Sequence, residues 1–166
     1  MLEKVLSKLD SKFDFDEVQA HCDVPCGIYD PITAQIAALT VVRMVDIMTD
    51  LEKSDTSKDL AFKNTIHRAV LVKEEHAEKV KHEIRVIWGD YIKAGHLENY
   101  PELHTLTHNI MQLGSKCRQT VNREAAVQLV AEVNRFAEIF WATKGKETKK
   151  AVAPYAPALE LVYPVL

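Results

Sequence analysis

The sequence is poor in the residues that interrupt helices and in the residue that builds disulfide frameworks. It contains five glycines, six prolines and three cysteines in 166 residues. So few glycines and prolines favour long helices. Three cysteines are too few for a disulfide framework, so we expect a reducing, cytoplasmic environment. No run of about 18 apolar residues is present, so no membrane association is expected. The formal net charge of −3 argues against a nucleic-acid partner.

The residues that are present, 47% apolar and 27% charged, are those of an ordinary globular domain. In four segments, joined by short connections, apolar residues recur at the spacing of an amphipathic helix. We therefore expect an all-α protein, an antiparallel four-helix bundle over residues 32–144. The helices are predicted over residues 32–51 and 58–93, from Pro101 through Cys117, and over residues 122–143, with a break at residues 95–100 and an end at Gly145.

Two segments flank the predicted bundle. Residues 1–20 mix five acidic residues with three lysines and lack the continuous apolar stretch of a secretory signal. They form either a short amphipathic leader or an ordinary terminal helix. Residues 145–166 combine clustered lysines with three prolines in an apolar run. We expect this tail to be extended and to pack on the domain or on a neighbouring subunit.

The segment HCDVPCGIYDP, residues 21–31, carries the candidate chemistry, and its prolines and glycine predict a loop. His21, Cys22 and Cys26 place one imidazole and two thiols within six residues, which favours a metal site. The alternatives are a disulfide between the two cysteines, or part of a zinc site completed by a distant histidine. So short a loop has too few side chains for a closed tetrahedral set. Backbone nitrogens could complete a planar N,S site that suits nickel or copper.

These residues resemble the nickel hook of the nickel-containing superoxide dismutases. The resemblance covers about residues 21–144, with later motifs in the family's order and nearly its spacing. Those motifs are Lys73-Glu74-Glu75 with Ala77-Glu78, Trp88-Gly89-Asp90-Tyr91, Tyr100-Pro101-Glu102-Leu103-His104 and Ile139-Phe140-Trp141-Ala142-Thr143-Lys144. The family is a homohexamer of four-helix bundles, which agrees with the helical periodicity and implies a hexamer here.

The resemblance implies an enzyme that converts superoxide to dioxygen and hydrogen peroxide while one nickel ion per subunit cycles between Ni(II) and Ni(III). It also implies that a dedicated protease removes residues 1–20, so that His21 becomes the first residue. The implied ligands are the new α-amine of His21, the amide nitrogen and thiolate of Cys22, and the thiolate of Cys26, with the His21 imidazole as an axial ligand. The uncut chain has a peptide nitrogen in place of that amine, so we expect it to be unable to assemble the site.

Four further residues match positions around the family's metal. Tyr29 and Tyr91 match the tyrosines that close the substrate pocket, the alternative being simple core packing. Lys93 matches a lysine that steers the anionic substrate, although an exposed helical lysine often contacts only solvent. Asp23 also matches the hook, and its alternative is an aspartate that stabilises a turn.

The chain departs from the family at two supporting positions. Ala37 stands where a glutamate orients the axial histidine, and His76 stands where an arginine supports it. Because such partners tune the orientation and basicity of a ligand, the axial bond would be held differently here, with His76 as the candidate.

Other functions and sites compete with this interpretation. The main alternative is a non-catalytic helical bundle that stores or delivers nickel or zinc. A third is a helical interaction module whose hook binds no metal specifically. His104 and His108 have the i, i+4 spacing of a zinc pair, but no third ligand is apparent in the sequence. Cys117 continues an apolar stripe and is expected to be an inert core thiol.

Overall fold

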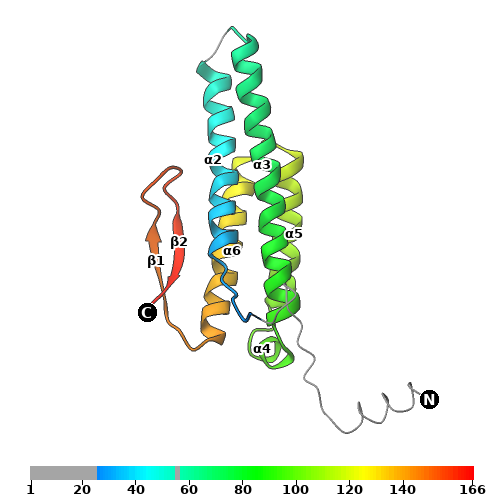
Figure 1. Ribbon diagram of the computed structural model, residues 1–166, viewed down its shortest axis with the longest axis vertical. Coiled ribbons are helices and arrows are strands. Elements are labelled where there is room, and N and C mark those ends of the chain that lie inside the picture. The colour runs from blue at the N-terminus through cyan, green and yellow to red at the C-terminus, as the bar shows by residue number, and fades with distance from the viewer. Residues whose placement is uncertain (1–25, 55–56) are drawn as a thin grey trace, which may run out of the picture.

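The structure is a computed structural model that describes residues 26–54 and 57–166. Within this range four long helices form a bundle, a short helix lies at one end, and a two-stranded hairpin lies along one side (Figure 1). In chain order the elements are α2 (Ile32–Ser54), α3 (Leu60–Val86), the π-helical turn η1 (Ile87–Tyr91), α4 (Ala94–Asn99), α5 (Leu103–Gln119), α6 (Arg123–Thr143), β1 (Thr148–Val152) and β2 (Glu160–Pro164).

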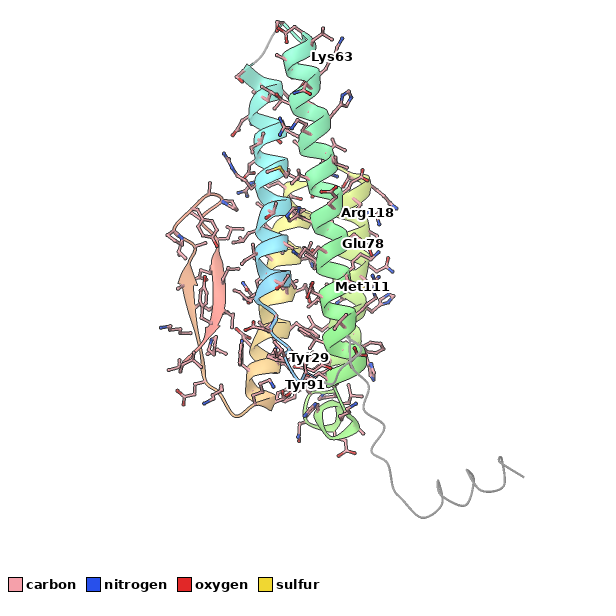
Figure 2. All side chains as sticks on the ribbon, viewed as in Figure 1. Tyr29, Lys63, Glu78, Tyr91, Met111 and Arg118 are labelled. Atoms are coloured by element: carbon pink, nitrogen blue, oxygen red, sulfur yellow. The ribbon has the colours of Figure 1, made fainter. Side chains whose placement is uncertain are left out.

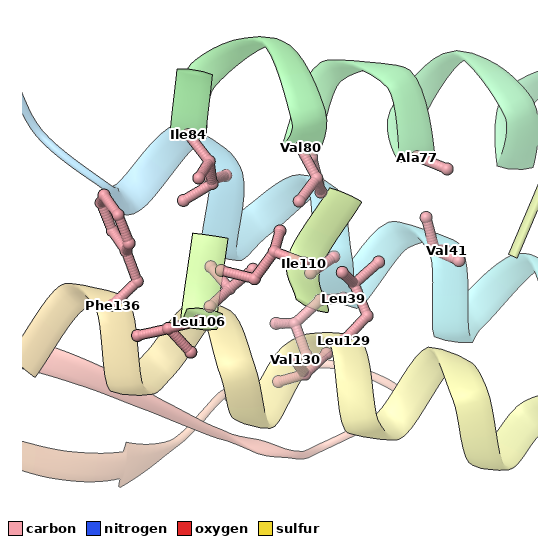
Figure 3. Packing of buried hydrophobic residues seen from close by; sticks show 14 of the residues in the cluster. Leu39, Val41, Ala77, Val80, Ile84, Leu106, Ile110, Leu129, Val130 and Phe136 are labelled. Atoms are coloured by element: carbon pink, nitrogen blue, oxygen red, sulfur yellow. The ribbon is translucent and has the colours of Figure 1, made fainter. Parts of the chain in front are cut away.

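The predicted four-helix bundle is confirmed. Helix α2 contacts α3 and α6, and α5 contacts the same two helices, so each helix has two neighbours around a common core. Side chains from all four helices meet there, among them Leu39, Ile84, Ile110 and Leu129 (Figure 3), each at most 2% exposed. Burying one such side chain stabilises a fold by about 1.5–3 kcal/mol. This shared core therefore holds the bundle together.

Local capping decides where two of the helices begin. Helix α3 begins at Leu60, slightly later than predicted, because the Asp59 side chain accepts a hydrogen bond from the Phe62 amide at 3.0 Å. Helix α6 begins directly after Asn122, where the sequence predicted its start. Asn122 Oδ1 accepts a hydrogen bond from the Ala125 amide at 2.8 Å.

The sequence predicted the end of the long helix and the segment after it wrongly. Regular α-helix ends at Val86, and the π-helical turn ends at Tyr91, short of the predicted end at residue 93. The predicted break at residues 95–100 is wrong over most of its length, because residues 94–99 form α4. The Lys93 amide caps this helix by donating to His96 Nδ1 at 3.2 Å. A helix of six residues with a single leucine has no apolar period that could be recognised in a sequence.

Helices α2 and α3 extend beyond the ends of α5 and α6 (Figure 1), and a second small cluster is buried between them, formed by Val45, Met48 and Ala69. By length and composition alone, α2 could cross a membrane, since its most apolar window has a mean hydropathy of 1.4. Half of that window is buried inside the bundle. Its apolar residues thus serve the contacts with α3 and α6, as in the core helix of a bundle.

A buried lysine explains one of the sequence motifs. Lys73 on α3 is 2% exposed, and its ammonium donates to the backbone carbonyls of Cys117, Arg118 and Thr120, the last two at 2.8 and 2.9 Å. These carbonyls lie at the C-terminal end of α5, where helical amide donors run out and the helix dipole favours a positive charge. Burial lowers the pKa of Lys73, while the charge of Glu74, and that of the Cys117 thiolate when it forms, raise it. The lysine therefore joins α3 to the end of α5.

The tail forms a β-hairpin, which the sequence did not predict. Its strands pair antiparallel, with Lys150 opposite Val162. Gln35 Nε2 on α2 donates to the Val162 carbonyl at 3.0 Å, and Asn134 Nδ2 on α6 donates to the Glu160 carbonyl at 2.8 Å. Gln35 also donates to Asn134 Oδ1 at 2.9 Å, and both side chains are buried. The tail thus packs on the domain, one of its two predicted placements. The all-α class describes the bundle but not this hairpin.

Candidate metal centre

Of the predicted nickel ligands, Cys26 lies at the N-terminal edge of the described chain. His21, Cys22 and Asp23 fall outside the described residues, whereas Cys26 is described and exposed. Gly27, which follows it, has a φ of +65°, and a Cβ there would meet nothing within 4 Å. Space is therefore not the constraint. A side chain would be strained by the left-handed backbone, so glycine allows the chain to turn directly after Cys26.

From Cys26 the chain leads straight into α2. Asp30 Oδ1 accepts a hydrogen bond from the Ile32 amide at 2.8 Å, and the carbonyl of Pro31 accepts one from the Gln35 amide at 3.0 Å. These bonds satisfy amides of the first helical turn, which have no partners within the helix. The start of α2 thereby fixes the point at which the hook leaves the bundle.

A cavity of about 180 Å³ lies beside this segment. Residues 28–30 form one wall, and the other wall comes from the end of α3 and the start of η1, through His82, Glu83, Val86 and Ile87. The cavity places an imidazole and a carboxylate of α3 next to the chain that leads from Cys26. No sequence pattern marked these two groups, because both belong to the charged face of a long helix.

The structure brings the two predicted tyrosines together. Tyr29 comes from the loop before α2 and Tyr91 from the last position of η1, and their ring centroids are 5.5 Å apart with planes tilted by 42°. Both rings are half-buried and pack against the main core. Figure 2 shows them side by side at the end of the bundle where the chain enters α2. Together they form the wall between the core and the loop that carries Cys26.

Four further side chains surround Tyr91. His96 stacks on its ring at 5.3 Å, and the Phe140 ring lies 5.0 Å away. The Tyr91 hydroxyl lies 2.8 Å from Thr143 Oγ1, and the Lys144 ammonium lies 4.6 Å from the ring centroid. The sequence reasoning assigned these residues no role. Three of them belong to the motif of residues 139–144, so this motif was the sequence feature that could have indicated their place beside Tyr91.

The other predicted residues lie apart from this pair or at its margin. Lys93 is exposed at the N-terminal cap of α4, two positions after Tyr91. His76 is half-buried on α3, and its Nδ1 donates to the Val72 carbonyl of the same helix at 2.8 Å. Only Nε2 of this ring remains for a second partner. Ala37 is buried in the core of the bundle at 2% exposure.

The remaining candidates do not form a metal site in the described part of the chain. Over residues 26–54 and 57–166, no three His, Cys, Asp or Glu side chains are grouped so as to hold an ion. His104 and His108 are exposed on α5, and the His104 ring packs edge-on against Trp88 at 5.6 Å. Cys117 is 1% exposed, and burial raises the pKa of its thiol to about 11. It lies in the core as predicted and keeps its proton near neutral pH.

Comparison with known proteins gives a consistent result. The family model of nickel-containing superoxide dismutase matches residues 16–144. The chain is 38% identical over 128 residues to a superoxide dismutase [Ni] of Streptomyces seoulensis, covering 77% of this chain and 91% of that protein. It is 36% identical over 127 residues to the protein of the same name from Streptomyces coelicolor, covering 76% and 90%.

Solved structures agree with this match. A crystal structure of a Ni-containing superoxide dismutase, with nickel ligation corresponding to the oxidized state, has a TM-score of 0.65 and 36% identity, covering 75% of this chain and 99% of that one. The native nickel superoxide dismutase structure at 1.30 Å has a TM-score of 0.64 and 35% identity, with the same coverage. The hairpin of β1 and β2 lies beyond the residues that the family model matches.

Proposed function

Since the chain belongs to the nickel-containing superoxide dismutase family, we propose that it is a nickel superoxide dismutase, which converts superoxide to dioxygen and hydrogen peroxide with one nickel ion per subunit. The match over residues 16–144, which contains the whole hook, carries this proposal. The neighbouring rings of Tyr29 and Tyr91 support it, because they lie where the chain from Cys26 enters the bundle. A non-catalytic storage bundle is not favoured, since the matched relatives are named as dismutases.

The donor set fits nickel. His21 would provide its α-amine and its imidazole, Cys22 its amide nitrogen and thiolate, and Cys26 its thiolate. A donor set of nitrogen and thiolate groups would suit Ni(II). When bound, nickel supplies one-electron redox chemistry by alternating between Ni(II) and Ni(III). Cys26 is exposed and is followed by the turn at Gly27, so its thiolate is accessible to an incoming ion.

Residues 1–20 act, in this proposal, as a leader that a protease removes before His21. The reason is chemical: a peptide nitrogen at His21 is a different donor from a free α-amine, because its lone pair is delocalised into the carbonyl and it must lose a proton before it can bind a metal. The uncut chain thus lacks one of the implied ligands. Asp23 would support the metal site from within the hook, and His76, through its second ring nitrogen, would support the His21 imidazole.

Tyr29 and Tyr91 would border the path of the substrate, and Lys93 would add positive charge at its mouth. The assembly that the family implies is a homohexamer. We place the protein in the cytoplasm, because two thiolate ligands need a compartment that keeps cysteine reduced. Light scattering of the nickel-loaded protein and fractionation of cells test these two points.

The decisive experiment compares chains with different first residues. A chain that begins at His21, released from a cleavable tag and supplied with nickel, should consume superoxide, whereas the full chain of residues 1–166 should not. Cys26→Ser should abolish both nickel binding and activity. Cys117→Ala is the matched control, because it removes a cysteine from the core and should leave both properties intact.

The outcomes separate the parts of the proposal. A nickel-loaded chain that begins at His21 and shows no activity would overturn the dismutase function. If the full chain were equally active, only the proposed role of cleavage would be overturned, and the dismutase function would stand. Uptake of zinc or nickel without any dismutation would instead support the storage function.

A further inference from the structure

The end of α6 is built around Tyr91 in a way that fixes the direction of a hydrogen bond. Thr143 Oγ1 donates to the Phe140 carbonyl at 2.6 Å. A carbonyl oxygen carries no hydrogen, so the single hydroxyl proton of Thr143 is committed to this bond. The Tyr91 hydroxyl, 2.8 Å from the same Oγ1, must therefore donate to Thr143. Its oxygen keeps only acceptor lone pairs for any further partner.

The Phe140 carbonyl is available for this bond because the helix ends there. In a continuing α-helix it would accept from the Lys144 amide, but that amide donates to the Trp141 carbonyl at 3.0 Å. Gly145, with a φ of +66°, turns the chain out of the helix directly afterwards. The helix end therefore creates the acceptor that orients Thr143.

The same helix end places the ammonium of Lys144 over the Tyr91 ring. The Lys144 ammonium lies 4.6 Å from the centroid of the Tyr91 ring and 5.2 Å from that of Phe140. An ammonium over aromatic faces at these distances is held by cation–π attraction, and the C-terminal end of α6 favours it further. The ammonium is thus held against the Tyr91 and Phe140 rings, although Lys144 as a whole is exposed.

We propose that Thr143 and Lys144 are positioning residues of the superoxide site: Thr143 orients the Tyr91 hydroxyl, and Lys144 holds a positive charge against the Tyr91 ring, where it attracts the anionic substrate. This inference rests on the proposed function. A chain of hydrogen bonds that ends on a carbonyl passes no proton onward. Tyr91 therefore receives no proton through Thr143, and its hydroxyl serves as an oriented acceptor.

The charge is tested by Lys144→Gln, with Lys144→Arg as the rescue and Lys146→Gln as the matched control. Lys146 is also exposed, and its substitution removes the same charge two positions further along the chain. In the nickel-loaded chain that begins at His21, Lys144→Gln should lower kcat/KM roughly 3- to 10-fold and flatten its dependence on ionic strength, because steering by charge is screened by salt. Lys144→Arg should restore both, and Lys146→Gln should leave both near the wild-type values.

The orientation is tested by Thr143→Val, with Thr143→Ser as the rescue. In the nickel-free protein with ring-labelled tyrosine, Thr143→Val should shift the NMR signals of Tyr91 more than those of Tyr100, Tyr155 and Tyr163. Thr143→Ser should return the signals towards their original positions. In the loaded enzyme, Thr143→Val should lower kcat while nickel content stays unchanged.

The results distinguish this inference from the proposed function. If the nickel-loaded wild type were inactive, the proposed dismutase function itself would be overturned. An active wild type in which Lys144→Gln matches Lys146→Gln in rate and salt dependence would overturn the role of Lys144. Unmoved Tyr91 signals in a folded Thr143→Val chain would overturn the role of Thr143.

Discussion

Replacing Lys73 by methionine tests whether a single buried ammonium closes the end of α5. The side chain donates to three carbonyls, of which that of Cys117 is buried and those of Arg118 and Thr120 are partly buried. Hydrogen bonds from a charged donor contribute about 1.5–3 kcal/mol each before the cost of burying the charge. That cost is real here, because burial is the main cause of the lowered pKa of Lys73.

The net loss follows from these opposing effects. Methionine fills the same volume but leaves the carbonyls without their donor, and water can reach only the partly buried ones. We expect Lys73→Met to lower the free energy of unfolding by about 2–4 kcal/mol. For a chain of this length that corresponds to a fall in Tm of roughly 4–16 °C.

Urea unfolding of the nickel-free protein measures this loss without a contribution from ligand binding. Lys81→Met on the same helix is the matched control, because the Lys81 ammonium has one hydrogen bond, to Ser115 Oγ at 3.1 Å, and a long 3.9 Å pairing with Glu78. We expect that control to cost less than about 1 kcal/mol. A Lys73→Met chain as stable as the Lys81→Met chain would refute the reasoning.

Three further predictions concern stability. Between pH 9 and 11 the free energy of unfolding of the wild type should fall by about 2 kcal/mol relative to that of Cys117→Ala, because the thiol ionises at its ordinary pKa of 9.0 when unfolded and at about 11 when folded. If the free energies of unfolding of the two proteins change in parallel across this range, the prediction is wrong. Asn134→Ala should lower the free energy of unfolding by about 2 kcal/mol, because the hairpin loses its hydrogen bonds to α6. The loosened hairpin should also be cleaved faster by chymotrypsin at the exposed Tyr155. Gly145→Ala should lower the free energy of unfolding, measured by thermal unfolding, by about 1 kcal/mol, because the backbone there is left-handed. Gly95→Ala is the control and should not destabilise the protein, because its Cβ also meets open space but the backbone has an ordinary φ.

The bundle could be predicted from the sequence because its causes are local. Apolar spacing marks the buried face of each helix, and a side chain such as Asn122 caps the helix that follows it within three residues. The hook was also predicted from local sequence, since the three proposed ligands lie within six consecutive residues. Its family resemblance then supplied a function that the composition alone did not contain.

The hairpin could not be predicted because its anchors are distant. Val162 bonds to Gln35 on α2, and Glu160 bonds to Asn134 on α6, and no local pattern connects these positions. Helix α4 was missed for a different reason, since six residues are too few to show a period. Where the structure corrects the sequence, the cause is a contact between remote segments or an element of one or two turns.

The sequence by itself determined that this protein is a helical bundle, and it predicted a metal-binding hook and a site that includes Tyr29 and Tyr91. Only the tertiary structure decided what surrounds that pair. Thr143 and Lys144 meet Tyr91 because α6 ends beside η1, although Thr143 lies 52 residues further along the chain than Tyr91. The physical reason is that spacing specifies which face of a helix is buried, whereas the packing of whole helices specifies which helix ends come together.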